Sequence, residues 1–317
     1  MDLLLEVART VRAAVRPHLG RASHRTAAGT AAGGDVTFGI DEIAEDAANA
    51  VLDRAAAAGP GLAWYTEDRG LVVRGTPERL IVVDPIDGTR PAGAGLEAAC
   101  VSVAAAPFDH AARLGDVDDG VVFEIKSGTL YRARRGNGVR IVDSGECREP
   151  SPSGQTSIDG AFWTYGFRGR PAKPSVVVLE ELLDGSGVSG GVFELGSATF
   201  GMMGVVTGRF DAYVDHGQRL IDDVPSTKPL FEAIAGGAIL NNSPYDVAAA
   251  LLICTEAGCT VTDARGQALE GRPLVGSGDG YTVSTLCACT PELHAAILSR
   301  LDRGIEQLRR SEIARGA

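Results

Sequence analysis

Two acidic residues, Asp84 and Asp87, stand at the end of an apolar, β-branched run at 80–83. Such a run is typical of a buried strand that stops at the first acid. Pro85 and Gly88 then indicate that the chain turns. The turn would place both carboxylates at the mouth of a rigid strand, beside backbone N–H groups that can bind an anion. A divalent cation between the carboxylates and a phosphate would reconcile these opposite charges.

The same segment has a simpler interpretation. Asp, Pro and Gly are the commonest turn formers, so 84–88 could be an ordinary turn, and short motifs often occur by chance. A second apolar run, 61–66, also ends at acids, Glu67 and Asp68. Two strand ends that carry carboxylates are suited to converge at one edge of a sheet. The alternative for Glu67 is a solvated charge at the start of a loop.

Two further acids stand where helices are expected to begin. A helix is predicted from Asp41 to about residue 58, and the acids of its first turn suit the helix dipole. Asp41 stands out among them because it lies where loop becomes helix and could face a site. Ser243-Pro244-Tyr245-Asp246 has the pattern of a capping box that opens a helix to residue 257. Capping alone could explain Asp246, although a cap can also be a metal ligand.

Composition bounds the class of protein. The chain has 317 residues, of which 44% are hydrophobic and 22% charged, which is typical of a soluble globular protein with a sizeable core. Its net charge of −11 argues against a nucleic-acid partner. We find no signal peptide and no run long enough to cross a bilayer. Six cysteines without CxxC spacing fit a reducing compartment, so a cytoplasmic protein without a membrane partner is expected.

The order of predicted elements divides the chain in two. Strands are expected at 98–106, 120–125 and 129–134, followed by a polar segment, 136–158, that is the best candidate boundary. Beyond it, strands and helices alternate, which predicts an α/β half. We therefore expect an N-terminal α+β half, 1–150, and a C-terminal half, 151–317, that carries Asp246. Within the second half, 217–243 is predicted to be an insertion with a short helix at about 226–234.

Taken together, these motifs resemble the inositol monophosphatase superfamily. The resemblance runs from about residue 34 to 266 in the expected order. It rests on 84–89 and 66–68, on 246–250 and 256–258, and on the segments 194–198 and 208–213. It implies an α/β (α+β) fold, a layered α-β-α-β-α sandwich with the site between its halves. It also implies an Mg²⁺-dependent, lithium-sensitive phosphomonoesterase that acts through a metal-activated water.

The resemblance also implies residue roles. Glu67, Asp84 and the carbonyl of Ile86 would hold a first Mg²⁺, and Asp84 would bridge to a second ion completed by Asp87 and Asp246. A third, weaker ion would lie near Glu67, and Mn²⁺ could substitute. Catalytic roles fall on Glu67 and on the water-activating pair Asp41 and Thr89. Residues expected to contact phosphate or substrate are Gly88, Thr89, Arg90, Gly196, Ser197 and Asp215. A homodimer is a further expectation.

Departures from the family pattern bear on the substrate. Arg90 replaces part of an Asn-Phe pair and could bind a second phosphate or a carboxylate, or be a solvated loop residue. The substrate-contacting acid falls on Asp215, one methylene shorter than the usual Glu, and the 217–243 insertion follows it. A rival metal acid, Asp222, is rejected because Pro225 prevents the helix that should follow it. The shorter acid at Asp215 and the insertion after it disfavour plain myo-inositol phosphate as the natural substrate.

The substrate class implied is a small polyol, sugar or nucleoside phosphate. The alternatives are a 3′(2′),5′-bisphosphate nucleotidase, a fructose-1,6-bisphosphatase, or a non-catalytic metal-binding regulatory protein on the same fold. The last is disfavoured because a non-catalytic relative has no reason to keep the whole set of residues. That set is Asp41, Glu67, Asp84, Asp87, Thr89 and Asp246.

Overall fold

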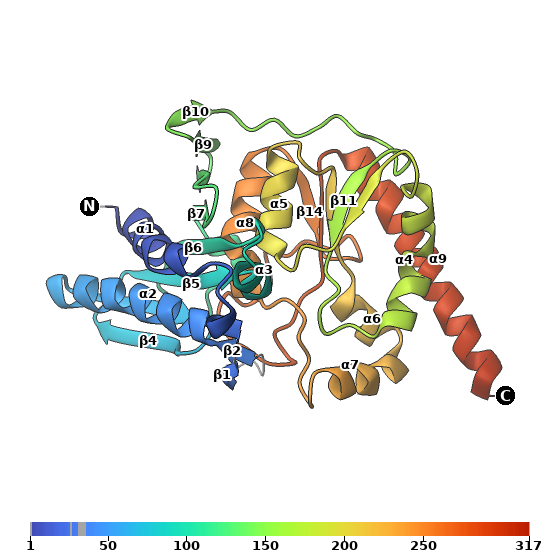
Figure 1. Cartoon of the computed structure of the whole chain (residues 1–317), viewed down its shortest axis with the longest axis horizontal. Helices are drawn as coiled ribbons and strands as arrows, with labels where there is room; N and C mark the ends of the chain where they lie inside the picture. Colours follow the sequence, from blue (N-terminus) through green and yellow to red (C-terminus); the bar gives the residue numbers. More distant parts are fainter. Residues whose placement is uncertain (1, 26, 31–35, 317) are drawn as a thin grey trace.

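The computed structural model describes residues 2–25, 27–30 and 36–316. Two β-sheets alternate with three layers of helices in one stack, which confirms the α-β-α-β-α prediction (Figure 1). The first sheet lies between an outer pair of helices, α1 (Leu3–Val15) and α2 (Gly39–Ala58), and an inner pair, α5 (Ala198–Val206) and α8 (Pro244–Glu256). The second sheet lies beyond that inner pair, against α4 (Ala172–Gly185) and α9 (Pro291–Gly316).

The first sheet is mostly antiparallel, in the order β10-β9-β8-β7-β6-β5-β3-β4. Its parallel pair is β3 with β5, which aligns Thr66 with Val83 and brings both strand ends to one edge. Its strands are β3 (Gly61–Thr66), β4 (Gly70–Gly75), β5 (Arg79–Asp87), β6 (Cys100–Pro107), β7 (Asp119–Glu124), β8 (Leu130–Arg134), β9 (Val139–Asp143) and β10 (Glu146–Arg148). A separate antiparallel pair, β1 (Ala27–Thr30) and β2 (Val36–Phe38), precedes α2.

The second sheet has the order β12-β11-β13-β15-β14. Its parallel strands are β11 (Phe162–Tyr165), β12 (Gly191–Phe193) and β13 (Ala212–Asp215), whereas β14 (Thr260–Thr262) and β15 (Thr285–Ala288) run antiparallel to their neighbours. Because β11 and β13 are parallel, with Tyr165 aligned to Val214, the loop after β11 and the end of β13 meet at one edge.

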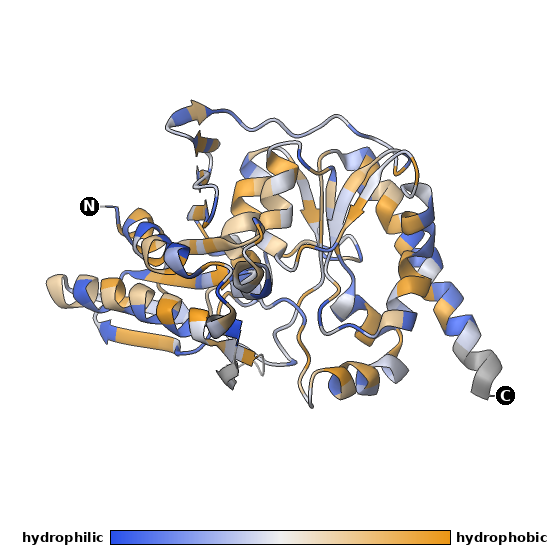
Figure 2. Cartoon of the chain, in the orientation of Figure 1, coloured by the Kyte–Doolittle hydropathy of each residue, from blue (hydrophilic) through white to orange (hydrophobic). Residues whose placement is uncertain are grey.

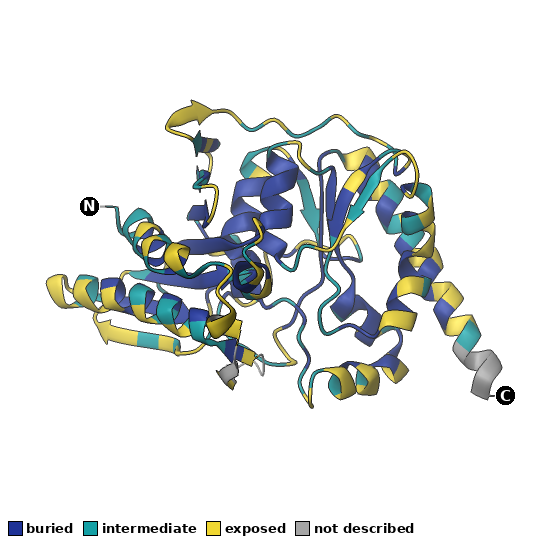
Figure 3. Ribbon diagram, in the orientation of Figure 1, coloured by how far each residue is buried: buried dark blue, intermediate teal, exposed yellow. Residues whose placement is uncertain are grey.

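The core has two parts, visible as inward-facing apolar and buried segments in Figures 2 and 3. One fills the space between α1, α2 and the first sheet and includes Trp64 and Leu52. The other surrounds α5 and α8, which are buried along almost their whole length. Small residues allow close approach there, since a Cβ on Gly120 of β7 would lie 3.3 Å from the Ala249 carbonyl oxygen of α8. None of the described helices has the length and apolar character of a membrane span.

Several elements differ from expectation. The polar segment proposed as a boundary contains β9 and β10, because pairing with β8 overrides its weak local signals. β4 was not predicted, and the 217–243 insertion holds α6 (Gly217–Asp223) as well as α7 (Lys228–Ile234). The chain crosses from the first sheet to the second between Arg148 and Phe162. The division into halves stays a prediction, because the larger core cluster includes residues of both sheets.

At the contact between α4 and α9, the effect of packing on stability can be compared with the effect of helix propensity. Gly304 lies in α9, and a Cβ there would lie 2.3 Å from the Val178 carbonyl oxygen of α4. Propensity alone favours Ala over Gly by about 1 kcal/mol. We expect Gly304→Ala instead to lower the free energy of unfolding by about 1–3 kcal/mol, because backbone atoms cannot yield. Urea denaturation measures the change.

The control is Ala295→Gly on the exposed face of α9, which reports propensity alone. It should cost about 1 kcal/mol. A Gly304→Ala variant more stable than the parent would contradict the packing described here.

Candidate active site

Four predicted metal ligands line one pocket, to which residues of both sheets contribute. Glu67 follows β3, Asp84 lies within β5, Asp87 ends β5, and Asp246 lies in the first turn of α8. Ile86, whose backbone carbonyl is a predicted metal ligand, also lines this pocket. A smaller adjoining pocket is lined by Asp41, Ala44, Glu45, Glu67, Asp68, Asp84, Pro85 and Ile86. The structure thus brings the predicted acids together.

The strand that carries the central acids was expected to stop at Asp84. It continues instead to Asp87 through a β-bulge. Asp84 aligns with Ser102 and Asp87 with Cys100, so Pro85 and Ile86 oppose a single residue of β6. A bulge tolerates Pro85, which has no N–H to give, and re-aims neighbouring side chains. Asp84 is 5% exposed and accepts a 3.0 Å hydrogen bond from Ile86 N–H.

Gly88 closes this segment at a position that only glycine fits. Its φ is 99°, and a Cβ would lie 2.3 Å from the Ala98 carbonyl oxygen. The next element, α3 (Thr89–Ala94), begins immediately after it. Gly88, Thr89 and Arg90 all line the pocket, as the sequence predicted.

Asp87, at the end of β5, is hydrogen-bonded to the start of α5, the helix that lies between the two sheets. Its Oδ2 accepts a hydrogen bond of 2.8 Å from Ser197 Oγ and another from Thr199 N–H. Ser197 is also the N-cap of α5, since its Oγ accepts from Phe200 N–H at 3.1 Å. Gly196 and Ser197 line the pocket, which places this predicted phosphate-binding segment opposite the bulge.

The Asp41–Thr89 pair is in hydrogen-bond contact. Thr89 Oγ1 donates to Asp41 Oδ1 at 2.7 Å, and Asp41 Oδ2 accepts from Phe38 N–H at 2.8 Å as the cap of α2. Thr89 Oγ1 also lies 3.4 Å from the Ile86 carbonyl oxygen. One carboxylate therefore both begins a helix and orients a hydroxyl beside the acidic pocket.

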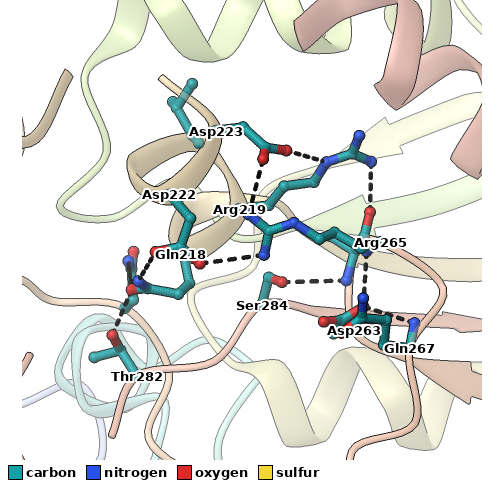
Figure 4. A network of polar contacts seen from close by, with 12 residues as sticks. Gln218, Arg219, Asp222, Asp223, Asp263, Arg265, Gln267, Thr282 and Ser284 are labelled. Atoms are coloured by element: carbon teal, nitrogen blue, oxygen red, sulfur yellow. Dashed lines mark hydrogen bonds and ion pairs between the residues drawn. The ribbon is translucent and has the colours of Figure 1, made fainter. Parts of the chain in front are cut away.

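Asp246 and its rival Asp222 lie in different surroundings. Asp246 Oδ2 caps α8 by accepting from Ser243 N–H at 2.7 Å, and the residue lines the pocket. Asp222 lies on α6 in a separate polar network, where it accepts from Gln218 and pairs with Arg265 at 3.1 Å (Figure 4). Among these two acids, the structure therefore brings only Asp246 to the pocket.

Burial and mutual repulsion raise the pKa values of the clustered acids. Burial raises the pKa of Asp84 well above its usual range, and the charges of Asp87, Asp246 and Glu67 add to it. Burial also raises the pKa of Asp246, against the opposing hydrogen bond from Ser243 N–H. The pKa of Asp87 is raised by burial despite its bonds from Thr199 and Ser197. Ionised carboxylates so arranged are costly without a nearby cation.

This donor set fits a hard divalent cation. Within the described residues, no group of three or more His, Cys, Asp or Glu side chains is arranged to hold a metal ion by itself. Mg²⁺ does not need such a cage, because it usually takes one or two carboxylates together with substrate phosphate oxygens and waters. Buried oxygen donors that repel one another, beside a carbonyl group, suit that mode of binding.

The opposite wall of the pocket contains residues that we did not predict. Among them, Arg168 and Arg170 come from the loop after β11, Asn241 and Asn242 come from the insertion, and Tyr213 comes from β13. The two arginines follow a predicted strand end, the same signal that identified Glu67. Asn241 and Asn242 carry no comparable signal, because their place depends on how the insertion folds back.

Asp215, which was predicted to contact substrate, does not line the pocket. It is fully buried. Its Oδ2 accepts from Arg170 Nη2 at 2.6 Å, and its Oδ1 accepts from Gly217 N–H at 2.9 Å. The shorter side chain is engaged behind the wall, so the arginine faces the pocket in its place.

Comparisons with known proteins identify the family of this chain. A model of the inositol monophosphatase family matches residues 2–306. The chain belongs to the inositol monophosphatase family. It is a phosphatase, that is, a phosphoric monoester hydrolase. The family resemblance drawn from the sequence is thereby confirmed.

Individual relatives and structures are similar over nearly the whole chain or most of it. A fructose-1,6-bisphosphatase/inositol-1-monophosphatase of Methanothermobacter thermautotrophicus is 28% identical over 94% of this chain and 95% of its own length. An inositol-1-monophosphatase of Mesorhizobium japonicum is 28% identical over 74% of each chain. A crystal structure of an inositol monophosphatase–fructose 1,6 bisphosphatase superposes with a TM-score of 0.71 at 22% identity, covering 94% of this chain and 98% of its own.

The repulsion among the acids generates a stability prediction. Asp84→Asn should raise the metal-free free energy of unfolding by on the order of 1 kcal/mol, because it removes a buried charge held among like charges. The same variant should lose the thermal stabilisation that Mg²⁺ gives to the parent protein. Thermal unfolding with and without Mg²⁺ measures both effects.

Asp222→Asn is the matched control, because it removes a carboxylate outside the pocket. It should show no metal-free stabilisation and should keep the Mg²⁺ response. The electrostatic account fails if Asp84→Asn keeps that response or if Asp222→Asn loses it.

Proposed function

We propose that the chain is an Mg²⁺-dependent phosphomonoesterase that hydrolyses a small polyol, sugar or nucleoside phosphate with an activated water. The observation that carries the proposal is the 2.7 Å hydrogen bond between Thr89 and Asp41 beside the acidic pocket. A hydroxyl held by a carboxylate can accept a proton from water and pass its own proton on. A non-catalytic metal-binding protein would have no use for that pair.

Mg²⁺ would be held by Glu67, Asp84, Asp87, Asp246 and the Ile86 carbonyl, with two or three ions per site and Mn²⁺ as a substitute. When bound, it would neutralise phosphate charge and lower the pKa of a bound water. Thr89 Oγ1 would take a proton from the attacking water while its own proton moves to Asp41 Oδ1. Backbone N–H groups of Gly88 and Thr89 would orient the phosphate oxygens, because positioning carries most of the rate in phosphoryl transfer.

The finer assignments belong to the same proposal. Partners would be a small phosphorylated metabolite and a second copy of the chain, in the cytoplasm. The net charge of −11 supports the absence of a nucleic-acid partner. A panel of inositol phosphates, hexose phosphates and bisphosphates, and nucleotide phosphates would identify the substrate. No release from any of them with Mg²⁺ would favour the regulatory alternative.

The proton pathway predicts that Asp41 and Thr89 act as one unit. Asp41→Asn and Thr89→Val should each lower kcat by about 10²–10⁴-fold, the usual range for general acid–base catalysis. The double variant should lose little more than either single variant, because both changes break the same relay. Steady-state phosphate release measures this, with Asp222→Asn as a control of normal kcat. Losses that multiply in the double variant would contradict a shared relay.

A second candidate, a bisphosphate as substrate, is favoured by the arginines of the pocket. Arg90 lines it with Arg168, and the Arg90 guanidinium lies over the Phe38 ring, 5.4 Å from its centroid. Stacking of this kind holds the planar guanidinium in place for bidentate contact with an anion. A second phosphate or a carboxylate on the leaving group would suit it.

The test is Arg90→Ala on singly and doubly phosphorylated forms of one sugar. We expect kcat/KM for the doubly phosphorylated form to fall by about tenfold or more, because a charge-assisted hydrogen bond is lost. The kcat/KM for the singly phosphorylated form should change little. Arg140→Ala, an exposed arginine that does not line the pocket, is the control. An equal effect on both substrates would remove the bisphosphate proposal.

A further inference from the structure

One nearly buried guanidinium in the pocket wall, that of Arg170, connects three separate segments. Arg170 and Asp215 form an ion pair whose side chains are 3% and 0% exposed. Arg170 donates through Nε and Nη2 to the two oxygens of Asp215, at 3.3 and 2.6 Å. Its Nη1 donates to the Arg168 carbonyl oxygen, and to that of Leu240 at 3.3 Å. The end of β13, the loop after β11 and the insertion therefore meet at Arg170.

Two glycines let these segments approach closely. Gly169 has a φ of 73°, and a Cβ there would lie 2.8 Å from Leu240 Cβ. A Cβ on Gly217 would lie 2.2 Å from Asn241 Oδ1 and 2.9 Å from Arg170 Nε. The backbone around the ion pair is thus packed without room for a methyl group, so a shift of one segment must move the others.

The tethered atoms belong to the face that a substrate would meet. Arg168, Leu240 and Asn241 line the pocket on the side away from the bulge. Asn241 Nδ2 donates to Gln218 Oε1 at 3.2 Å, and Thr282, another lining residue, donates to the same oxygen. Gln218 in turn begins the network of α6 seen in Figure 4. The wall is held from behind at each of these points.

A buried ion pair is by itself weak evidence of stabilisation, because desolvation offsets the attraction. What a fork of five N–H donors provides is geometry: it fixes several acceptors in one plane, which a point charge cannot do. Here two of those acceptors are carbonyl groups of lining residues.

We propose that Arg170 is a positioning residue that fixes the leaving-group wall, and that Asp215 acts through Arg170 without touching the substrate. The proposal rests on the proposed phosphatase function and deepens it. Asp84 lies in β5 of the first sheet, Asp41 in α2 and Thr89 in α3, whereas Arg170 follows β11 of the second sheet. Loss of the wall should therefore weaken substrate binding and leave the chemical step nearly intact.

The test uses Arg170→Met with Asp215→Asn, a double variant that removes both charges and so leaves no buried ion unpaired. With the ester that the parent protein hydrolyses fastest, we expect KM to rise about tenfold and kcat to change less than about threefold. Arg170→Lys, which keeps the charge but not the fork, should give a smaller rise. Gly169→Ala, which leaves the ion pair in place, should also raise KM by displacing Leu240.

The matched control is Arg79→Met with Asp118→Asn, an Arg–Asp pair outside the pocket and outside the α6 network, which should leave KM and kcat unchanged. Hydrogen exchange supplies a readout that needs no activity: amides of 166–171 and 238–242 should exchange faster in the Arg170 and Asp215 double variant. A folded double variant with unchanged KM, or with normal exchange in these segments, would overturn the inference. A parent protein that hydrolyses no ester but shows the exchange change would instead refute the proposed function.

Discussion

The structure is arranged around carboxylates that repel one another at the end of β5. Asp84 is nearly buried, and the charges of Asp87, Asp246 and Glu67 raise its pKa further. An isolated cluster of this kind favours unfolding or protonation at neutral pH. The proposed Mg²⁺-dependent function explains why the fold keeps the cluster, because a cation site needs several anionic oxygens in one place. The acidic cluster therefore lowers the stability of the fold at this place, in exchange for the charged groups that the proposed chemistry needs.

Helix ends reduce part of that cost. Asp41 and Asp246 each use one oxygen to cap a helix, α2 and α8 respectively, and Asp87 accepts from the first turn of α5. The positive ends of three helix dipoles therefore face the acids, α2 from the outer layer and α5 and α8 from the inner layer. From the sequence, Asp246 could be a cap, a metal ligand or both, and in the structure it caps α8 and also lines the pocket.

Local signals were sufficient for the acidic side of the site. Apolar runs that end in acids located Glu67 and Asp84, and the Ser243–Asp246 capping box located the start of α8. The bulge could not be predicted, because it depends on how β6 aligns with β5. Contacts across long separations were missed for the same reason: Asp215 pairs with Arg170, and Asn241 reaches the pocket only because the insertion folds back over the loop after β11. Edge strands such as β10 lack a buried face and so lack a pattern.

The central claim is that these acids and a phosphate occupy one site only when a divalent cation joins them. Calorimetric titration of inorganic phosphate, with Mg²⁺ and then with chelator, tests it most directly. We predict that phosphate binds with Mg²⁺ and that its affinity falls at least about tenfold without it, and that phosphate tightens Mg²⁺ binding by the same factor, as linkage requires. Equal phosphate affinity with and without Mg²⁺ would contradict the account.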